Sequence, residues 1–463
     1  MNSQMQKLKK NKVVIYLGLV IGLAIISLLL NVMYSAFVSE GEKPVTGTIL
    51  PDNNSNKQYI AVFVDGIRQS VFPAKTSGKH FQGVTCTNGA TAYFNPRTWS
   101  LKVESTAPTN CNVNFGTQSY CAQNNVTNLK DCLIGIEGGI KAIKDNLLPF
   151  SGAYLPKAET EAQTMVIATD DEYGETYVYR GHRDYLKNNV IFAGYQWKIV
   201  RINGDGSIRL VYNGIEAQFT SNGNTMNTTG ANTNYELRGF NHSQPLYNAH
   251  VGFRAGSVNS GSYVSEHSNT GTNEIWNYGV RDIYDHFALQ GTTFTSKIAD
   301  NLFCGDRTMV SPGYPSANTG LGYGTNATYY SAYLRVVQDQ LPTLKCPNEN
   351  DQYTSSSSAI GNKALGTRMI GLLSVDEVMF AGAVHRLSSD DNNTAFYLYS
   401  GQAYWTMSPA YYSTNAYEFM IGSTGGVGSS NVGSELGVRP VINLKSTVTI
   451  VSGDGSANNP YRV

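Results

Sequence analysis

Charged residues are scarce in this sequence, and the two signs cancel. Of 463 residues, 15% are charged, and 34 Lys and Arg residues balance 34 Asp and Glu residues, so the formal net charge at pH 7 is zero. A chain with this balance has no basic field to neutralise a phosphate backbone. We therefore expect no nucleic-acid partner.

The usual signatures of catalysis and metal binding are also missing. The seven histidines form neither a His-x-His nor a His-Glu-x-x-His spacing, and the chain has no Cys-x-x-Cys pair, Gly-x-Ser-x-Gly elbow or phosphate-binding glycine loop. The acidic segment 390–393 could hold calcium, but no calcium-ligand motif supports this, and a plain turn needs no ion. We expect a protein that is not an enzyme, with no catalytic residue, metal or cofactor.

A long hydrophobic run lies near the N-terminus, over Val13–Leu30, and a cluster of lysines precedes it over residues 7–12. The run is long enough to span a bilayer, and the positive-inside rule places the lysines in the cytoplasm. The sequence predicts a cytoplasmic tail at 1–12, a transmembrane anchor at 13–38 and an extracellular remainder, which makes a single-pass membrane protein. A cleaved signal peptide is the alternative, although its apolar region usually has only about 7–15 residues.

The cysteines agree with a location outside the cytoplasm. An even number of cysteines in an oxidising compartment indicates disulfides. Sequential pairing is favoured, although six cysteines allow 15 pairings. The six residues are Cys86, Cys111, Cys121, Cys132, Cys304 and Cys346.

Tyrosine and glycine are abundant, with 30 and 46 residues, which favours turn-rich β-structure. After a polar tether at 39–56, strand patterns at 57–117 predict a small β-sandwich. Apolar residues at helical spacing from Leu129 to Leu148 predict a helical connector within 118–164.

Residues 165–463 form the predicted head domain. It opens with alternating strands at 176–180, 190–193, 196–202 and 207–212, and Asn203-Gly204-Asp205-Gly206 is a hairpin turn between the last two. An apolar stripe predicts a helix over 276–287, and residues 311–330 should be a long surface loop. The predicted fold class is a β-rich α+β protein.

Two charged positions in the head are interpreted as structural. Ser374-Val375-Asp376-Glu377 is a capping box that opens a helix, and this explains the acidic pair without catalysis. Arg439 precedes Pro440 at the entry to a buried strand, where a guanidinium group holds carbonyl groups or a carboxylate in place.

The candidate ligand-binding residues lie in a polar stretch from Ala410 to Glu435. Its composition predicts an exposed recognition loop, in which aromatic side chains supply contact area and small polar ones supply hydrogen bonds. The candidates are Tyr411, Tyr412, Asn415, Tyr417, Ser423, Ser429, Ser430 and Asn431.

Several motifs carry a resemblance to known families. Residues 165–463 look like uncharacterised surface proteins of Gram-positive gut bacteria, and the Trp405-x-x-Ser408-Pro409 and Gly437-Val438-Arg439-Pro440 elements resemble C-type-lectin-like domains related to the formylglycine-generating enzyme. The segment 86–92 with Cys111 resembles an immunoglobulin-like module. These resemblances imply an immunoglobulin-like β-sandwich, a C-type-lectin-like α+β head and recognition through its last segment. Glu-Pro-Asn and Trp-Asn-Asp motifs are missing, so calcium-dependent sugar binding is not implied.

The leading hypothesis is a membrane-anchored bacterial surface protein that binds an extracellular protein or glycan through its head. One alternative is a structural subunit of a pilus or cell envelope. Others are a variable-loop target of a diversity-generating retroelement and, less favoured, a cell-wall hydrolase.

Overall fold

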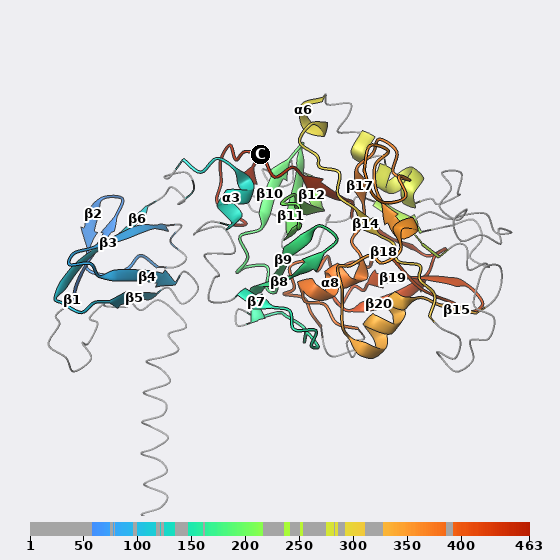
Figure 1. Ribbon diagram of the computed structural model, residues 1–463, viewed down its shortest axis with the longest axis horizontal. Coiled ribbons are helices and arrows are strands. Elements are labelled where there is room, and N and C mark those ends of the chain that lie inside the picture. Colours follow the sequence, from blue (N-terminus) through green and yellow to red (C-terminus); the bar gives the residue numbers. More distant parts are fainter. Residues whose placement is uncertain are drawn as a thin grey trace, which may run out of the picture. The chain divides into compact units, whose positions relative to one another are not determined.

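A computed structural model describes most of residues 58–463 (Figure 1). The segments outside the described residues are 1–57, 75–76, 78, 96–99, 117–120, 122–124, 135–146, 161–162, 216–235, 241–250, 253–274, 282, 286–291, 311–326 and 386–391. The described chain divides into two compact units. The first comprises the described residues up to Phe94 together with Leu101–Thr117, and the second comprises the rest.

The first unit is built from β-strands around a cluster of phenylalanine rings. Its larger sheet has the order β2-β1-β6-β3, and β4 and β5 form a hairpin. Phe94 on β4 stacks on Phe81 of β3 with ring centroids 4.5 Å apart and meets Phe115 of β6 edge-on, so the hairpin packs against the sheet. The strands are β1 (Gln58–Val64), β2 (Ile67–Gln69), β3 (His80–Cys86), β4 (Thr91–Asn95), β5 (Ser100–Glu104) and β6 (Thr109–Gly116).

The second unit contains a large sheet whose central strands are buried. Its main path is β17-β22-β12-β11-β9-β8-β7, and β10 joins β11 at one side and pairs with β23. Every residue of β11 is buried, and the predicted turn at 203–206 connects β11 to β12. The strands are β7 (Leu147–Pro149), β8 (Met165–Asp171), β9 (Gly174–Arg180), β10 (Asn189–Phe192), β11 (Tyr195–Ile202), β12 (Ile208–Ile215), β17 (Ile370–Gly371), β22 (Val441–Leu444) and β23 (Tyr461–Arg462).

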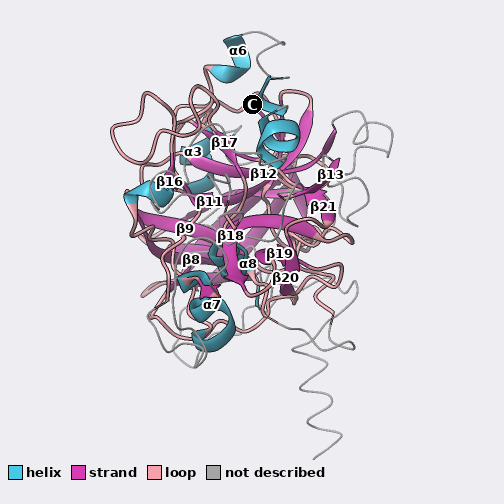
Figure 2. Cartoon of the chain, turned by 90° about the vertical axis from the view of Figure 1, so that its right-hand side faces the viewer, coloured by secondary structure: helices cyan, strands magenta, loops and turns pink. Residues whose placement is uncertain are grey.

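A second sheet in this unit carries the C-terminal candidate residues. Its strand order is β13-β21-β18-β19-β20, with β15 paired to β18, and Figure 2 shows β18, β19 and β20 side by side. A short ladder of β14 and β16 lies apart from it. The strands are β13 (Glu236–Gly239), β14 (Phe303–Cys304), β15 (Thr328–Tyr329), β16 (Gln352–Tyr353), β18 (Tyr404–Tyr412), β19 (Ala416–Ile421), β20 (Val427–Asn431) and β21 (Glu435–Val438).

Helices are short in the described residues. α8 is buried along its whole length and contacts β9 of the large sheet and β18 of the second sheet (Figure 1). Its predicted capping box is confirmed, because Ser374 accepts from the Glu377 amide and Glu377 accepts from the Ser374 amide. The helices are α3 (Leu129–Ile134), η5 (Ile275–Val280), α6 (Thr292–Thr295), α7 (Ser331–Tyr333), η6 (Leu334–Asp339), η7 (Glu349–Asp351) and α8 (Val375–Ala381).

The predicted fold class is wrong. We expected a β-rich α+β protein with an N-terminal transmembrane helix, a small β-sandwich and a C-type-lectin-like α+β head, but the structure is mostly β with few helices and is only 13% helical. The predicted membrane segment at 13–38 lies outside the described residues, and none of the described helices is long and apolar enough to cross a membrane.

Two local predictions also need correction. The predicted connector helix is helical over Leu129–Ile134, but Leu147 and Leu148 belong to β7, which pairs in parallel with β8. The stretch from Ala410 to Glu435 is no loop, because it contains the end of β18 and all of β19 and β20, which form an antiparallel meander. Strand pairing satisfies backbone groups that an exposed loop would leave to water.

Candidate functional site

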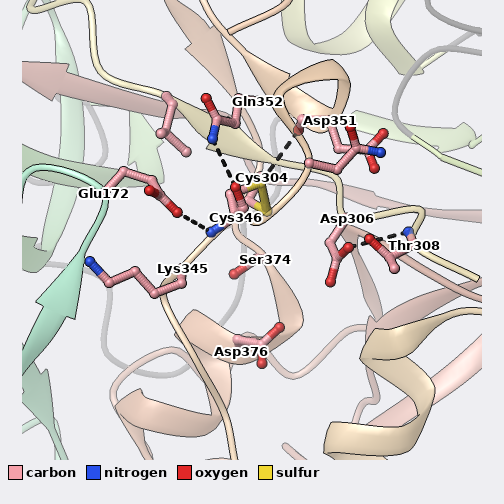
Figure 3. Close-up of a disulfide and its surroundings, with 12 residues drawn as sticks. Glu172, Cys304, Asp306, Thr308, Lys345, Cys346, Asp351, Gln352, Ser374 and Asp376 are labelled. Atoms are coloured by element: carbon pink, nitrogen blue, oxygen red, sulfur yellow. Dashed lines mark hydrogen bonds between the residues drawn. A yellow bond between two sulfur atoms is a disulfide. The ribbon is translucent and has the colours of Figure 1, made fainter. Parts of the chain in front are cut away.

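Three disulfides hold the described residues, and they join the cysteines in sequential order, as the sequence favoured. Cys86–Cys111 links β3 to β6, and Cys121–Cys132 ties α3 to the chain just before it. Cys304–Cys346 closes 42 residues of the second unit and fastens β14 to the segment before η7 (Figure 3). Such bonds persist in an oxidising compartment.

Beside the third disulfide lies a group of buried ion pairs, which we call the charged cluster. Its centre is Glu377 on α8, whose Oε1 accepts from Arg201 Nε at 2.9 Å and from Arg209 Nη1 at 2.7 Å. Arg201 also binds Asp171 on β8 at 2.5 Å. Burial by itself raises the pKa of Glu377, but the two arginines outweigh it and hold this pKa below its usual value.

The other half of the charged cluster surrounds Arg335 on η6. Arg335 forms a two-pronged pair with Asp376, through Nε at 2.9 Å and Nη2 at 3.0 Å, and donates from Nη1 to Asp306 at 2.7 Å. Asp306 lies on the chain that leaves Cys304, and Asp376 is the first-turn acid of α8 (Figure 3). The helix, the disulfide segment and η6 are therefore joined by charge-assisted hydrogen bonds.

The charged cluster encloses a cavity of about 20 Å³, which Arg201, Arg335, Asp306 and Glu377 help to line. This space holds about one water molecule. Each acidic residue that lines it is bound by an arginine, as the preceding distances show. The carboxylates that line the cavity are therefore committed to structural pairs.

Arg439 acts as a clamp between the two sheets, which confirms its predicted structural role. It lies where the chain leaves β21 in the second sheet and enters β22 in the large sheet. Its guanidinium donates to the carbonyl groups of Tyr212 on β12 and Leu398, at 3.1 and 2.6 Å, and lies over the ring of Tyr404 on β18. One side chain therefore contacts both sheets.

The second sheet presents a different arrangement, a row of tyrosines that we call the tyrosine ladder. Tyr329 on β15, Tyr411 on β18 and Tyr417 on β19 are direct partners across neighbouring strands. Their rings stack, with centroids 5.4 Å apart for Tyr329 and Tyr411 and 4.5 Å apart for Tyr411 and Tyr417. Asn431 on β20 continues the row opposite Tyr417, and Tyr333 of α7 closes the other end edge-on to Tyr329.

All three rings of the tyrosine ladder are half-buried. Both faces of the middle ring, Tyr411, are covered by neighbouring rings. Burial raises the pKa of the Tyr411 hydroxyl, and a hydrogen bond with Ser429 on β20 opposes that rise. Burial also raises the pKa of Tyr329, and the neighbouring Tyr333 adds to the effect. The hydroxyls of Tyr329 and Tyr411 therefore stay protonated at neutral pH and can donate or accept hydrogen bonds.

The structure brings only some of the predicted ligand-binding residues together. Tyr411, Tyr417, Ser429 and Asn431 belong to the tyrosine ladder or border it. The remaining four are scattered. Tyr412 is buried, Asn415 lies between β18 and β19, Ser423 is exposed in the turn after β19, and Ser430 on β20 pairs with Glu418 of β19.

Sequence reasoning missed Tyr329 and Tyr333. Tyr329 lay inside a predicted surface loop, and the short strand β15 forms only because β18 offers a partner. The local abundance of tyrosine at 329, 330 and 333 was the signal that could have drawn attention to them, but Tyr329 lies on β15 and Tyr333 on α7, so no single periodicity relates the two.

Glu418 lies one position from the tyrosine ladder and is fully buried. Its Oε2 accepts from the Gly252 amide at 3.0 Å, and its Oε1 has no hydrogen-bond partner within the described part of the chain. Burial raises the pKa of this carboxyl well above its usual value, although the Gly252 amide and Arg307 act against the rise. Glu418 is therefore a buried neutral acid at mildly acidic pH.

Among the described residues, no group of three or more His, Cys, Asp or Glu side chains is placed to hold a metal ion. The acidic pair Asp390-Asp391, considered above for calcium, lies outside them. The neighbouring Asn393 is buried and binds the Gly382 carbonyl through Nδ2 at 3.1 Å, so it supports the end of α8.

Comparison with known proteins identifies one domain. Residues 325–446 match the model of a domain of unknown function, DUF6273. The match spans the tyrosine ladder, α8 and Arg439. No curated protein and no solved structure gives a significant match to this chain.

Proposed function

We propose that this protein is a surface protein that binds a protein partner through the tyrosine ladder and acts by binding, not by catalysis. The observation that carries the proposal is the stack of Tyr329, Tyr411 and Tyr417, whose half-buried rings follow neighbouring strands in register. Rigid aromatic side chains with a polar tip supply large contact area at a small cost in side-chain entropy.

The geometry of the tyrosine ladder favours a protein over a glycan. Flat stacking of a sugar ring requires an open aromatic face, and here the faces of Tyr411 lie against Tyr329 and Tyr417. The middle ring therefore offers its edge and hydroxyl group, and a row of such groups suits the mixed apolar and hydrogen-bonding surface of a protein partner. The half-buried Ser429 and Asn431 on β20 add small polar groups at the border.

A location outside the cytoplasm, at the outer side of the cell membrane, is part of this proposal. All described cysteines are paired, and three disulfides in one chain are typical of exported proteins. The resemblance of residues 165–463 to surface proteins of Gram-positive bacteria supports the same location.

The proposal is tested by screening the full-length chain against one array of extracellular proteins and one of glycans. We expect a protein ligand whose affinity falls at least tenfold in Y411S and Y417S. The matched control is Y154S, which removes an exposed tyrosine outside the second sheet and should bind as the wild type does. Ligands that are all glycans, or protein ligands that Y411S and Y417S bind normally, would refute the proposal.

A further inference from the structure

Lys198 and Asn189 form a buried pair in the large sheet that neither the charged cluster nor the tyrosine ladder uses. Lys198 on β11 is 1% exposed, and Asn189 on β10 is fully buried. The two are direct partners in the antiparallel pairing of β10 and β11. Lys198 Nζ lies 2.6 Å from Asn189 Oδ1, which places the amine next to the carboxamide carbon.

Lys198 has no counter-ion that would keep an ammonium stable at this depth. It forms no ion pair with a carboxylate of the described residues, and its hydrogen-bond partner is a neutral amide. Burial lowers the pKa of Lys198 to about 7, Arg439 and Arg183 lower it further, and Asp184 opposes them. An appreciable fraction of the amine is therefore neutral and nucleophilic at neutral pH.

The carboxamide of Asn189 is held in a fixed orientation. Its Nδ2 donates to the Gly455 carbonyl at 2.8 Å, and the same carbonyl accepts from the Asn189 backbone amide at 3.0 Å. Nζ, Oδ1 and Nδ2 are thus each positioned by the sheet or by the segment before β23. Reactants held in this way react as one molecule, which removes most of the entropic barrier of a bimolecular step.

We propose that Lys198 and Asn189 condense into an intramolecular amide bond across β10 and β11. Nζ attacks Cγ of Asn189, a bond forms between them, and the bond between Cγ and Nδ2 breaks. The proton that Nζ gives up leaves with Nδ2, so ammonia is released and nothing is oxidised or reduced. The nearby positive charges of Arg439 and Arg183 favour the unprotonated Lys198 amine that this step requires.

The product replaces a buried amine by a neutral amide, which removes the cost of keeping a basic group out of water. It also joins β11, at the centre of the large sheet, to β10, which carries the C-terminal strand β23. The sheet would then resist separation of these strands without any dependence on redox conditions, unlike the disulfides.

The test is the intact mass of the full chain, measured after reduction and denaturation. We expect a mass lower than that of the reduced sequence by one ammonia molecule, and a digest that contains one branched peptide joining Lys198 to Asn189. The variants K198R and N189A should each regain the full mass. A full mass in the folded wild type would overturn the proposal.

The branched peptide separates this proposal from loss of ammonia at another asparagine, such as Asn203 before Gly204. If ammonia is lost but K198R still loses it, the reaction lies elsewhere and the proposal fails. Because the peptide is sought in the wild type, the result does not depend on whether the buried variants fold.

Discussion

The charged cluster and the tyrosine ladder lie in the same unit, and both contact α8 or its neighbouring strands, but they commit their polar atoms differently. In the charged cluster, Glu377 and Asp376 bind arginines of the same chain. In the tyrosine ladder, Tyr411 and Tyr417 stack on each other and are only half-buried. Polar groups satisfied inside the fold give stability, whereas those left at the surface remain able to bind a partner.

The largest effect should come from neutralising the centre of the charged cluster. E377Q keeps an amide oxygen for the capping box but leaves Arg209 without a buried counter-charge and Arg201 with Asp171 alone, so the free energy of unfolding should fall by about 3–5 kcal/mol. Urea unfolding followed by the fluorescence of Trp197 and Trp405 measures it.

The control for E377Q is S374A, which removes the cap from Ser374 and should cost only about 1 kcal/mol. If E377Q and S374A lower the free energy of unfolding by equal amounts, the ion pairs add no stability, and the contrast with the tyrosine ladder does not hold.

The next effect concerns the disulfide beside the charged cluster. C304S/C346S opens a loop of 42 residues. The unfolded chain then gains conformational entropy, so the free energy of unfolding should fall by about 2–4 kcal/mol. Binding to the partner of the tyrosine ladder should be unchanged under native conditions. Equal losses of binding and stability in this variant would show that the two regions are not independent.

A smaller, pH-dependent effect is expected at Glu418. Its folded-state pKa lies above the unfolded value near 4.5, so the folded state keeps a proton that the unfolded state loses. Stability should therefore fall as pH rises from about 4.5 toward the folded pKa, by up to about 1.4 kcal/mol per pH unit.

E418Q removes the ionisable group at this position and should flatten that slope, which makes the variant more stable than the wild type at neutral pH. Unfolding curves between pH 4 and pH 8 measure it, with E435Q at an exposed glutamate as control. Parallel curves for the wild type and E418Q would mean that Glu418 is ionised in the fold.

The smallest change in stability is expected within the tyrosine ladder. Y411F keeps the stacked ring and loses only the hydroxyl that bonds Ser429, so it should cost about 1 kcal/mol or less. Its affinity for a protein partner should nevertheless fall, because the hydroxyl edge is part of the proposed surface. An unchanged affinity in Y411F, with a loss in Y411S, would assign the contact to the ring alone.

Local patterns predicted much of the large sheet. Strands with β-branched and aromatic residues were recognised at 190–193 and 196–202, and the turn at 203–206 follows from its Asn-Gly pair. The capping box at Ser374 and Glu377 is a motif of four consecutive residues and needs no distant partner. Each of these features depends on neighbours along the chain.

The meander of the second sheet could not be predicted in the same way. β20 reads Val-Gly-Ser-Ser-Asn, which has weak strand propensity, and it forms because β19 pairs with it. On β19, Glu418 interrupts the apolar pattern of a buried face, and it is tolerated there because it accepts a hydrogen bond from the Gly252 amide. Tertiary pairing overrode local preference at both places.

By itself, the sequence determined the balanced charge, the even number of cysteines with a preference for sequential pairing, the strand-and-turn pattern of the large sheet and the cap of α8. Only the tertiary structure decided that Arg201, Arg209 and Glu377 neutralise one another, and that Tyr329 stacks on Tyr411 from 82 residues away in the chain. The physical reason is that ion pairing and ring stacking act over a few ångströms in space. Spacing along the chain does not record which distant strands become neighbours.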